Sequence, residues 1–151
     1  MSMTQDARPI VPALGRIYPA ATDWSYVLLR VVAGLMLITH VWPKLMAGPA
    51  AIAANVMTRR GVEPALAAAY VAIIVECLGA VCITLGLFTR VVAALLVLEF
   101  LVIVKVHFTG GGWGNATNGA EYPFLWLIVY VYIMFRGGGP YSVDRLLGRE
   151  V

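Results

Sequence analysis

The sequence predicts an all-α integral membrane protein, an antiparallel four-helix bundle with a short interfacial helix between the first and second spans. Three observations predict this class. Hydrophobic residues make up 61% of the 151 residues and charged residues only 13%, whereas a soluble domain has about 45–50% apolar and about 25% charged residues. The apolar residues gather in four long runs. Within these runs apolar and polar residues do not alternate, as they do in the strands of a membrane β-barrel.

The four runs match the length that a membrane helix requires. An α-helix rises about 1.5 Å per residue, so a hydrocarbon core of about 30 Å needs roughly 20 residues. The predicted membrane domain, residues 23–136, contains spans at residues 24–43, 64–87, 90–108 and 121–136. The fourth run is short, so it must extend into the preceding loop or let its terminal arginine reach the lipid headgroups.

The connections agree with an antiparallel arrangement. The second and third spans are joined by a tight turn at residues 86–90. Between the first and second spans, residues 48–63 combine alanines and larger apolar residues with Arg59 and Arg60. This composition favours a short helix that lies on the membrane surface.

The remaining segments are interpreted as a loop and two tails. Residues 109–121 are rich in glycine and asparagine, and Pro123 suits the first turn of a helix that follows. Residues 1–22, which contain three prolines, are expected to form a flexible N-terminal tail. Residues 137–151 are expected to form a cytoplasmic C-terminal tail.

Basic residues near the span ends predict the orientation, because cytoplasmic loops are enriched in lysine and arginine. Those on the side of the termini are Arg8, Arg16, Arg90, Arg136, Arg145 and Arg149, and those on the other side are Lys44, Arg59, Arg60 and Lys105. We therefore expect both termini in the cytoplasm. The basic residues are scattered instead of clustered, which argues against nucleic acid binding.

Charged residues inside the spans form the first candidate site. Arg30 lies in the first span, Glu76 near the middle of the second and Glu99 near the middle of the third. A charge at the bilayer centre costs about 2.5–3.5 kcal/mol on insertion scales, so such residues face the bundle and find partners. We therefore predict an intramembrane cluster of these three residues as the candidate catalytic site. One arginine cannot neutralise two carboxylates, so one of them could hold a proton. Equally, the cluster could serve only to orient the helices.

A second candidate site is expected at the opposite, non-cytoplasmic end of the bundle. Its candidate ligand-binding residues are His40, Lys44, His107, Trp113 and Glu121. Cationic donors, aromatic faces and a carboxylate at the mouth of a bundle could hold the polar head of an amphipathic ligand such as a quinone. The alternative is that these are the aromatic residues and lysines common at membrane interfaces. No tight metal-ligand spacing such as HExxH is present, so we predict no metal site.

Several short motifs follow one another along nearly the whole chain after the N-terminal tail. They are Leu29-Arg30-Val31-Val32-Ala33-Gly34 followed by His40 and Lys44, Glu76 with Gly79, Gly86-Leu87-Phe88-Thr89-Arg90, His107-Phe108 followed by Asn118-Gly119 and Glu121-Tyr122-Pro123, and residues 137–147. In their order and spacing they resemble the DoxX family of small bacterial membrane proteins. The resemblance implies a four-helix bundle in the bacterial cytoplasmic (inner) membrane. It also implies a loose association with redox chemistry, because the family is named with a subunit of a thiosulfate:quinone oxidoreductase.

The resemblance supplies no established catalytic residues, and this chain departs from the family pattern in places. Pro43 stands where a glycine-containing turn is common, and Glu99 and Lys105 are additional charges in the third span. These departures leave open whether the chain shares the ligand or partner of its relatives.

Two functions remain open at this point. The first is a subunit of an oxidoreductase that associates with a quinone or another small lipophile. No haem, flavin or iron–sulfur ligation pattern is present, so no cofactor is assigned and quinone is the one candidate. The alternative is a non-catalytic scaffold or assembly partner for another enzyme or transporter. The expected partners are the lipid bilayer, other redox proteins of the membrane and a second copy of the chain.

Overall fold

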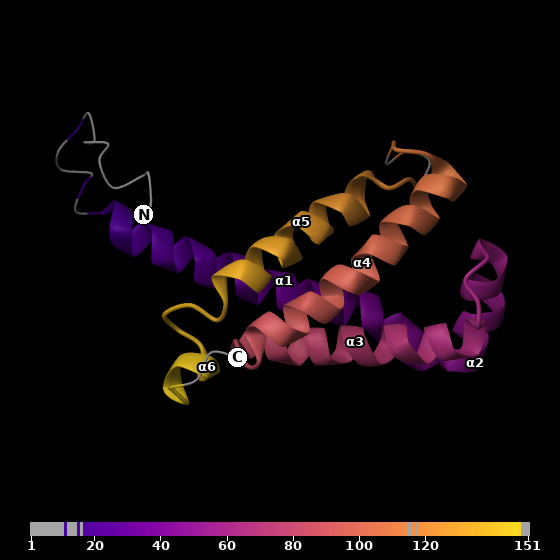
Figure 1. Ribbon diagram of the computed structural model, residues 1–151, viewed down its shortest axis with the longest axis horizontal. Helices are drawn as coiled ribbons and strands as arrows, with labels where there is room; N and C mark the ends of the chain where they lie inside the picture. The colour runs from indigo at the N-terminus through magenta and orange to yellow at the C-terminus, as the bar shows by residue number, and fades with distance from the viewer. Residues whose placement is uncertain (1–10, 12–14, 16, 115, 117, 149–151) are drawn as a thin grey trace.

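The computed structural model describes residues 11, 15, 17–114, 116 and 118–148, which are helical apart from turns and contain no strand (Figure 1). This confirms the predicted all-α class. The α-helices are α1 (Tyr18–Ala47), α2 (Pro49–Ile52), α3 (Ala65–Leu85), α4 (Thr89–Gly111), α5 (Glu121–Arg136) and α6 (Val143–Leu146). Most of the predicted N-terminal tail lies outside the described residues, but α1 begins at Tyr18, so residues 18–22 are helical.

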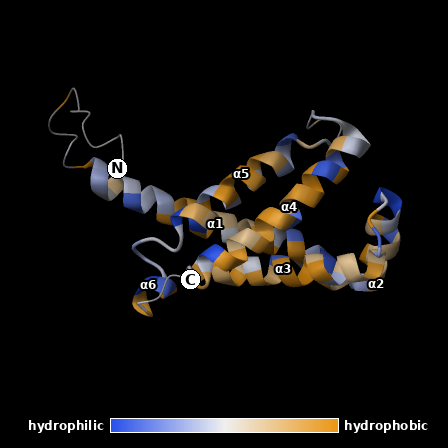
Figure 2. Cartoon of the chain, viewed as in Figure 1, coloured by the Kyte–Doolittle hydropathy of each residue, from blue (hydrophilic) through white to orange (hydrophobic). Residues whose placement is uncertain are grey.

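Three helical stretches are long and apolar enough to cross a membrane, namely Ala21–Ala47, Ala65–Leu85 and Thr89–Gly111. Figure 2 shows the hydrophobic colour that runs along α3 and α4. The fourth predicted span forms α5, a helix of 16 residues. At about 1.5 Å per residue it is roughly 24 Å long, which is shorter than a hydrocarbon core of about 30 Å. The first three spans are therefore found as apolar helices, whereas a fourth crossing stays a prediction.

Helix α1 continues through Pro43, where the sequence predicted that the first span would end. A proline inside a helix removes one backbone hydrogen bond but does not always stop the helix. The end comes at Gly48, which has φ of 81°, a conformation that favours glycine. As a result Lys44 lies on the last turn of the helix, from which its side chain can reach α3.

The helices pack as two pairs, α1 along α3 and α4 along α5, and the pairs meet where α3 contacts α4. In Figure 1 the α4–α5 pair diverges from the α1–α3 pair toward the loop that joins α4 to α5. The buried residues at the crossing include Ala33, Ile83, Leu96 and Tyr130. Side chains from all four of these helices line the space between the two pairs.

The short helix predicted between the first and second spans is present as a helical segment of mixed type. Helix α2 is followed by a π-helical turn, η2 (Ala53–Met57), and a 3₁₀ turn, η3 (Thr58–Arg60). Both α2 and η2 contact α3, so the segment folds back on that helix beyond the end of α1 (Figure 1). That it lies on a membrane surface stays a prediction.

A close approach of α1 to α3 depends on Gly34. A Cβ atom at this position would lie 2.2 Å from Thr84 Oγ1 and 2.6 Å from the Thr84 backbone nitrogen. Small residues allow helices in membranes to come this close. The contact sets the register of α1 against α3, which decides the residues that face each other farther along the pair.

The segment after α5, residues 137–148, docks onto the bundle through α6, and the cytoplasmic location of the predicted C-terminal tail, residues 137–151, stays a prediction. Asp144, on α6, accepts hydrogen bonds from the backbone nitrogens of Phe88 and Thr89 at 2.7 and 2.9 Å and from the Thr89 hydroxyl at 2.7 Å. The Asp144 nitrogen in turn donates to the Gly86 carbonyl at 2.9 Å. These bonds satisfy backbone groups at the start of α4, which would otherwise lack partners within the helix.

Candidate functional site

An ion pair between α1 and α3 forms the centre of the site. Lys44 Nζ lies 2.5 Å from Glu76 Oε1. The Glu76 side chain is 4% exposed and that of Lys44 is 27% exposed, so the pair sits at the boundary between the helix interface and an open space. The other carboxylate oxygen, Glu76 Oε2, is shielded and has no hydrogen-bond partner in the part of the chain that the structure describes.

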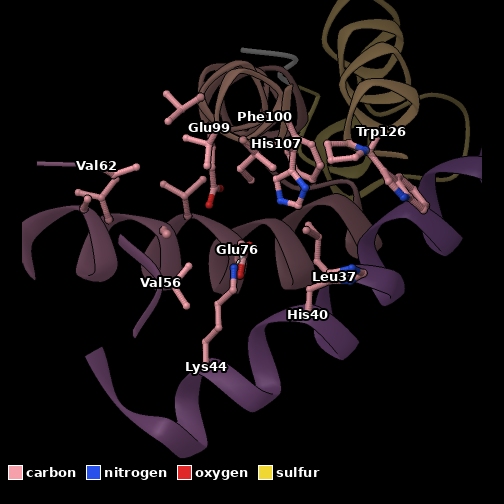
Figure 3. Close-up of a pocket in the computed structure, with 18 of the residues that line it drawn as sticks. Leu37, His40, Lys44, Val56, Val62, Glu76, Glu99, Phe100, His107 and Trp126 are labelled. Atoms are coloured by element: carbon pink, nitrogen blue, oxygen red, sulfur yellow. Dashed lines mark hydrogen bonds and ion pairs between the residues drawn. The ribbon is translucent and has the colours of Figure 1, made fainter. Parts of the chain in front are cut away.

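A second carboxyl group faces this pair from α4. In Figure 3 the Glu99 side chain points from α4 toward Glu76 on α3, while Lys44 reaches Glu76 from α1. Both Glu99 oxygens are shielded and have no hydrogen-bond partner among the described residues. The structure places Glu76 and Glu99 in the wall of the same pocket. The cation paired with Glu76 is Lys44, which the sequence placed in a different group.

These groups line a pocket of about 930 Å³ between α1, α3, α4 and α5, which η2 and η3 also border. This volume falls in the range of about 300–1,000 Å³ that is usual for sites of small ligands. Most of the wall is aliphatic, with the charged residues Lys44, Arg60, Glu76 and Glu99 among it. An apolar pocket with a few convergent polar groups is the usual form of a ligand site.

Helix α5 gives the pocket an aromatic wall, which the sequence reasoning missed. Tyr122, Trp126 and Tyr130 all line the pocket because residues four apart share one face of a helix. The ring centroids of Trp126 lie 6.1 Å from those of both tyrosines. Phe100 from α4 adds a ring 5.1 Å from Tyr130. The spacing of aromatic residues in the fourth apolar run was the signal that could have found this wall.

Arg30 does not join the two carboxylates, so the predicted three-residue cluster is wrong in this respect. Its guanidinium donates to the carbonyls of Ile83 at 2.7 Å and Thr84 at 2.8 Å, and to that of Tyr141 at 2.7 Å. The physical reason is the antiparallel register of α1 and α3, which places Arg30 at the C-terminal end of α3, about two turns beyond Glu76. There the carbonyls that lack partners within the helix attract a cation.

Three of the five residues predicted for the second site lie in the pocket wall and two lie outside it. His40, Lys44 and His107 line the pocket, whereas Trp113 and Glu121 are not part of its wall. His107 Nδ1 donates to the Asn118 carbonyl at 2.9 Å, and the His40 ring stacks on Tyr122 with centroids 6.4 Å apart. One pocket therefore contains two residues of the first predicted site and three of the second, namely Glu76, Glu99, His40, Lys44 and His107.

The pocket combines a large apolar surface with a small number of polar and charged groups. Among the described residues, no three histidine, cysteine, aspartate or glutamate side chains come together in a way that could hold a metal ion. The site instead offers carboxyl groups, a lysine, imidazoles and aromatic faces around an apolar volume. It can hold a ring or chain by contact and a polar head by hydrogen bonds.

Comparisons with known proteins agree with the resemblance seen in the motifs. A protein-family model, DoxX, matches residues 25–109. A protein of Haemophilus influenzae described as an uncharacterized protein is 30% identical over 122 residues, which cover 78% of this chain and 86% of that protein. No solved structure matches the chain. The matched family segment includes Lys44, Glu76 and Glu99 and ends before the aromatic wall of α5.

Proposed function

This chain belongs to the DoxX family of membrane proteins, and on that premise we propose that it binds a quinone or a similar small lipophile as the membrane subunit of a redox system. The observation that carries the proposal is the pocket of about 930 Å³ in which the Glu99 carboxyl group and one Glu76 oxygen have no hydrogen-bond partner within the described part of the chain. Buried polar atoms usually have a hydrogen-bond partner. A bound polar head group would supply one.

The character of the polar groups favours a quinone over other lipophiles. An uncompensated carboxylate is costly in an apolar environment, so a protonated Glu99 suits this pocket and can donate to a carbonyl oxygen. When a quinone is reduced to a quinol, it takes up two electrons and two protons. In this proposal the Glu99 carboxyl lies where a proton is needed, and the electrons come from a partner redox protein.

The proposed topology places the protein in the bacterial inner membrane with four crossings and cytoplasmic termini. The start of α1, the end of α5 and α6 lie close together, because Arg136 pairs with Asp23 at 3.3 Å and Trp24 stacks on Tyr141. Arg90 and Arg145 belong to this same end. Its basic residues support a cytoplasmic location under the positive-inside rule. The short α5 would cross with Arg136 extended toward the lipid headgroups.

The test compares wild-type protein with Glu99→Gln and with Glu63→Gln as a matched control. Glu63 lies outside the pocket wall, and glutamine keeps an oxygen that can accept the hydrogen bond from the Ala65 nitrogen. Protein purified from membranes is extracted with organic solvent for quinone, and the same variants in lipid nanodiscs are titrated with menadione. We expect wild type and Glu63→Gln to bind both, and Glu99→Gln to bind more weakly by a factor of about ten.

A measurement in cells connects binding to redox function. In strains that carry each variant, we expect Glu99→Gln to shift the quinol-to-quinone ratio of the membrane in the same direction as deletion of the protein. Glu63→Gln should match wild type. Absence of extracted quinone together with absence of menadione binding by the wild-type protein would refute the proposal.

A non-catalytic scaffold is the second candidate, and the buried ion pair of Lys44 and Glu76 favours it. This pair joins α1 to α3 and can serve helix association alone. If that is its only role, Glu76→Gln should lower the abundance of the protein and the yield of co-purifying partners together. A Glu76→Gln protein with normal abundance and partners but altered quinone binding would exclude this candidate.

A further inference from the structure

One polar atom in the aromatic wall has no role in the site described so far. Trp126 lines the pocket, and its indole Nε1 is shielded from solvent without a hydrogen-bond partner among the described residues. The indole N–H can only donate, and a buried tryptophan usually has an acceptor for it. The adjoining pocket is the space from which such an acceptor can come.

Two polar atoms of neighbouring side chains already have backbone carbonyls as hydrogen-bond partners. The Tyr130 hydroxyl donates to the Ala33 carbonyl at 3.1 Å, and His40 Nδ1 lies 2.9 Å from the Met36 carbonyl. Tyr122 and Tyr130 pack their rings on either side of Trp126 along α5. This packing holds the indole in place, which is what a selective hydrogen bond to a ligand requires.

We propose that Trp126 determines ligand selectivity by donating its Nε1 hydrogen to a carbonyl oxygen of a planar, uncharged ring held against the aromatic wall. The inference rests on the proposed function and makes it more specific. A hydrocarbon without an acceptor would leave the indole unpaired. An anionic head group, such as a fatty acid carboxylate, would have to compete with the Glu76 carboxylate for Lys44, whose Nζ already lies 2.5 Å from Glu76 Oε1.

Trp126 and Glu99 can donate hydrogen bonds to two different atoms of the ligand. In Figure 3 Trp126 and Glu99 lie in different parts of the pocket. In this proposal a ring with polar groups on two sides contacts both residues, with one polar group at Trp126 and the other at Glu99. A ring with a single carbonyl would use only one of them and bind less tightly.

The test uses two probes of nearly identical shape, menadione and 2-methylnaphthalene, which differ in the two carbonyl groups. Binding to protein in lipid nanodiscs is measured by equilibrium dialysis against empty nanodiscs, for wild type, Trp126→Phe and Trp113→Phe. Trp113 is a matched control because it is outside the pocket wall and packs on Phe124. We expect Trp126→Phe to weaken menadione binding roughly three- to tenfold and to leave 2-methylnaphthalene binding within twofold. Trp113→Phe should change neither.

Two results would overturn the inference while leaving the proposed function intact. One is unchanged menadione binding by Trp126→Phe, and the other is an equal loss for both probes, which would indicate ring packing alone. If wild-type protein does not bind menadione at all, the proposed function fails and this inference fails with it.

A measurement on unaltered protein keeps the test decisive if Trp126→Phe does not fold. The chain has four tryptophans, whose indole N–H resonances can be assigned in ¹⁵N-labelled protein. Menadione should move the Trp126 resonance downfield, as a new hydrogen bond to oxygen does, and 2-methylnaphthalene should not. The same displacement with both probes, or none with menadione, would contradict the proposal.

Discussion

Asp144 caps helix α4 from 55 residues away in the sequence, with its Oδ2 atom 2.9 Å from the Thr89 nitrogen and 2.7 Å from the Thr89 hydroxyl. The two residues are buried, with Asp144 3% and Thr89 0% exposed. A cap of this kind is usually supplied by the residue directly before the helix. Here the residue before α4 is Phe88, which cannot accept a hydrogen bond through its side chain. The C-terminal segment therefore completes the turn between α3 and α4.

Asp144→Ala is expected to lower the free energy of unfolding by about 1–3 kcal/mol, because it removes a helix cap and leaves buried donors without an acceptor. The loss should be visible as a lower thermal midpoint in detergent. Asp23→Asn is a suitable control, since Asp23 is half exposed and exposed ion pairs contribute about 0–1 kcal/mol. Equal midpoints for the two variants would contradict the capping role.

Lys44 and Glu76 are expected to be energetically coupled, whereas Arg30 and Glu76 are not. For residues in direct contact, a double-mutant cycle typically gives an interaction free energy of about 0.5–3 kcal/mol, and for distant residues the effects add within about 0.5 kcal/mol. Unfolding measurements on Lys44→Met, Glu76→Gln and their combination test the contact. The parallel cycle with Arg30→Met serves as the control. Strong coupling in the Arg30 cycle would argue for the cluster of Arg30 with Glu76 that the sequence predicted.

Arg30→Lys is expected to destabilise the protein although the charge is kept. The planar guanidinium donates hydrogen bonds to three carbonyls, two on α3 and one on the segment after α5. The ammonium group of lysine is a single nitrogen and cannot reach all three. Hydrogen bonds from charged groups contribute about 1.5–3 kcal/mol each, so the loss of one or two should lower the thermal midpoint clearly. Limited proteolysis should also cut residues 137–148 faster, because Arg30 no longer holds Tyr141. Unchanged cleavage would show that Arg30 does not fasten this segment.

Gly34→Ala is expected to disturb the α1–α3 interface. The added Cβ would lie 2.2 Å from Thr84 Oγ1, and the nearby backbone would have to move. Overpacking of this kind costs typically about 1–3 kcal/mol. Gly110→Ala is the matched control on α4, where an added Cβ meets nothing within 4 Å. If thermal midpoints fall equally for both variants, the close approach at Gly34 has no special role.

The regions that the sequence predicted correctly depend on short-range patterns. Apolar runs of about 20 residues required helices, because a backbone in hydrocarbon must satisfy its own hydrogen bonds. The turn at residues 86–90 required α3 and α4 to be neighbours. Glu76 and Glu99 each lie near the middle of their runs, which brings two carboxyl groups to a similar depth in an antiparallel pair.

The partners of the charged residues depended on information that no local pattern contains. Arg30 and Lys44 are both on α1, and no local sequence pattern distinguishes which of them forms the ion pair with Glu76. Three features of the tertiary structure determine which cation pairs with Glu76. Gly34 lets α1 pack closely against Thr84 of α3, and α1 continues through Pro43 and includes Lys44. The segment after α5 folds back and binds Arg30 through the Tyr141 carbonyl.

By itself, the sequence determined the helical class, the three long apolar helices and the membership of the chain in a family of membrane proteins, because these follow from composition and from residues close together in the chain. Only the tertiary structure decided which cation meets Glu76, that parts of the two expected sites line one pocket, and that Trp126 belongs to it. Such contacts arise from the relative rotation and translation of whole helices, which many side chains set together and no single stretch of residues encodes.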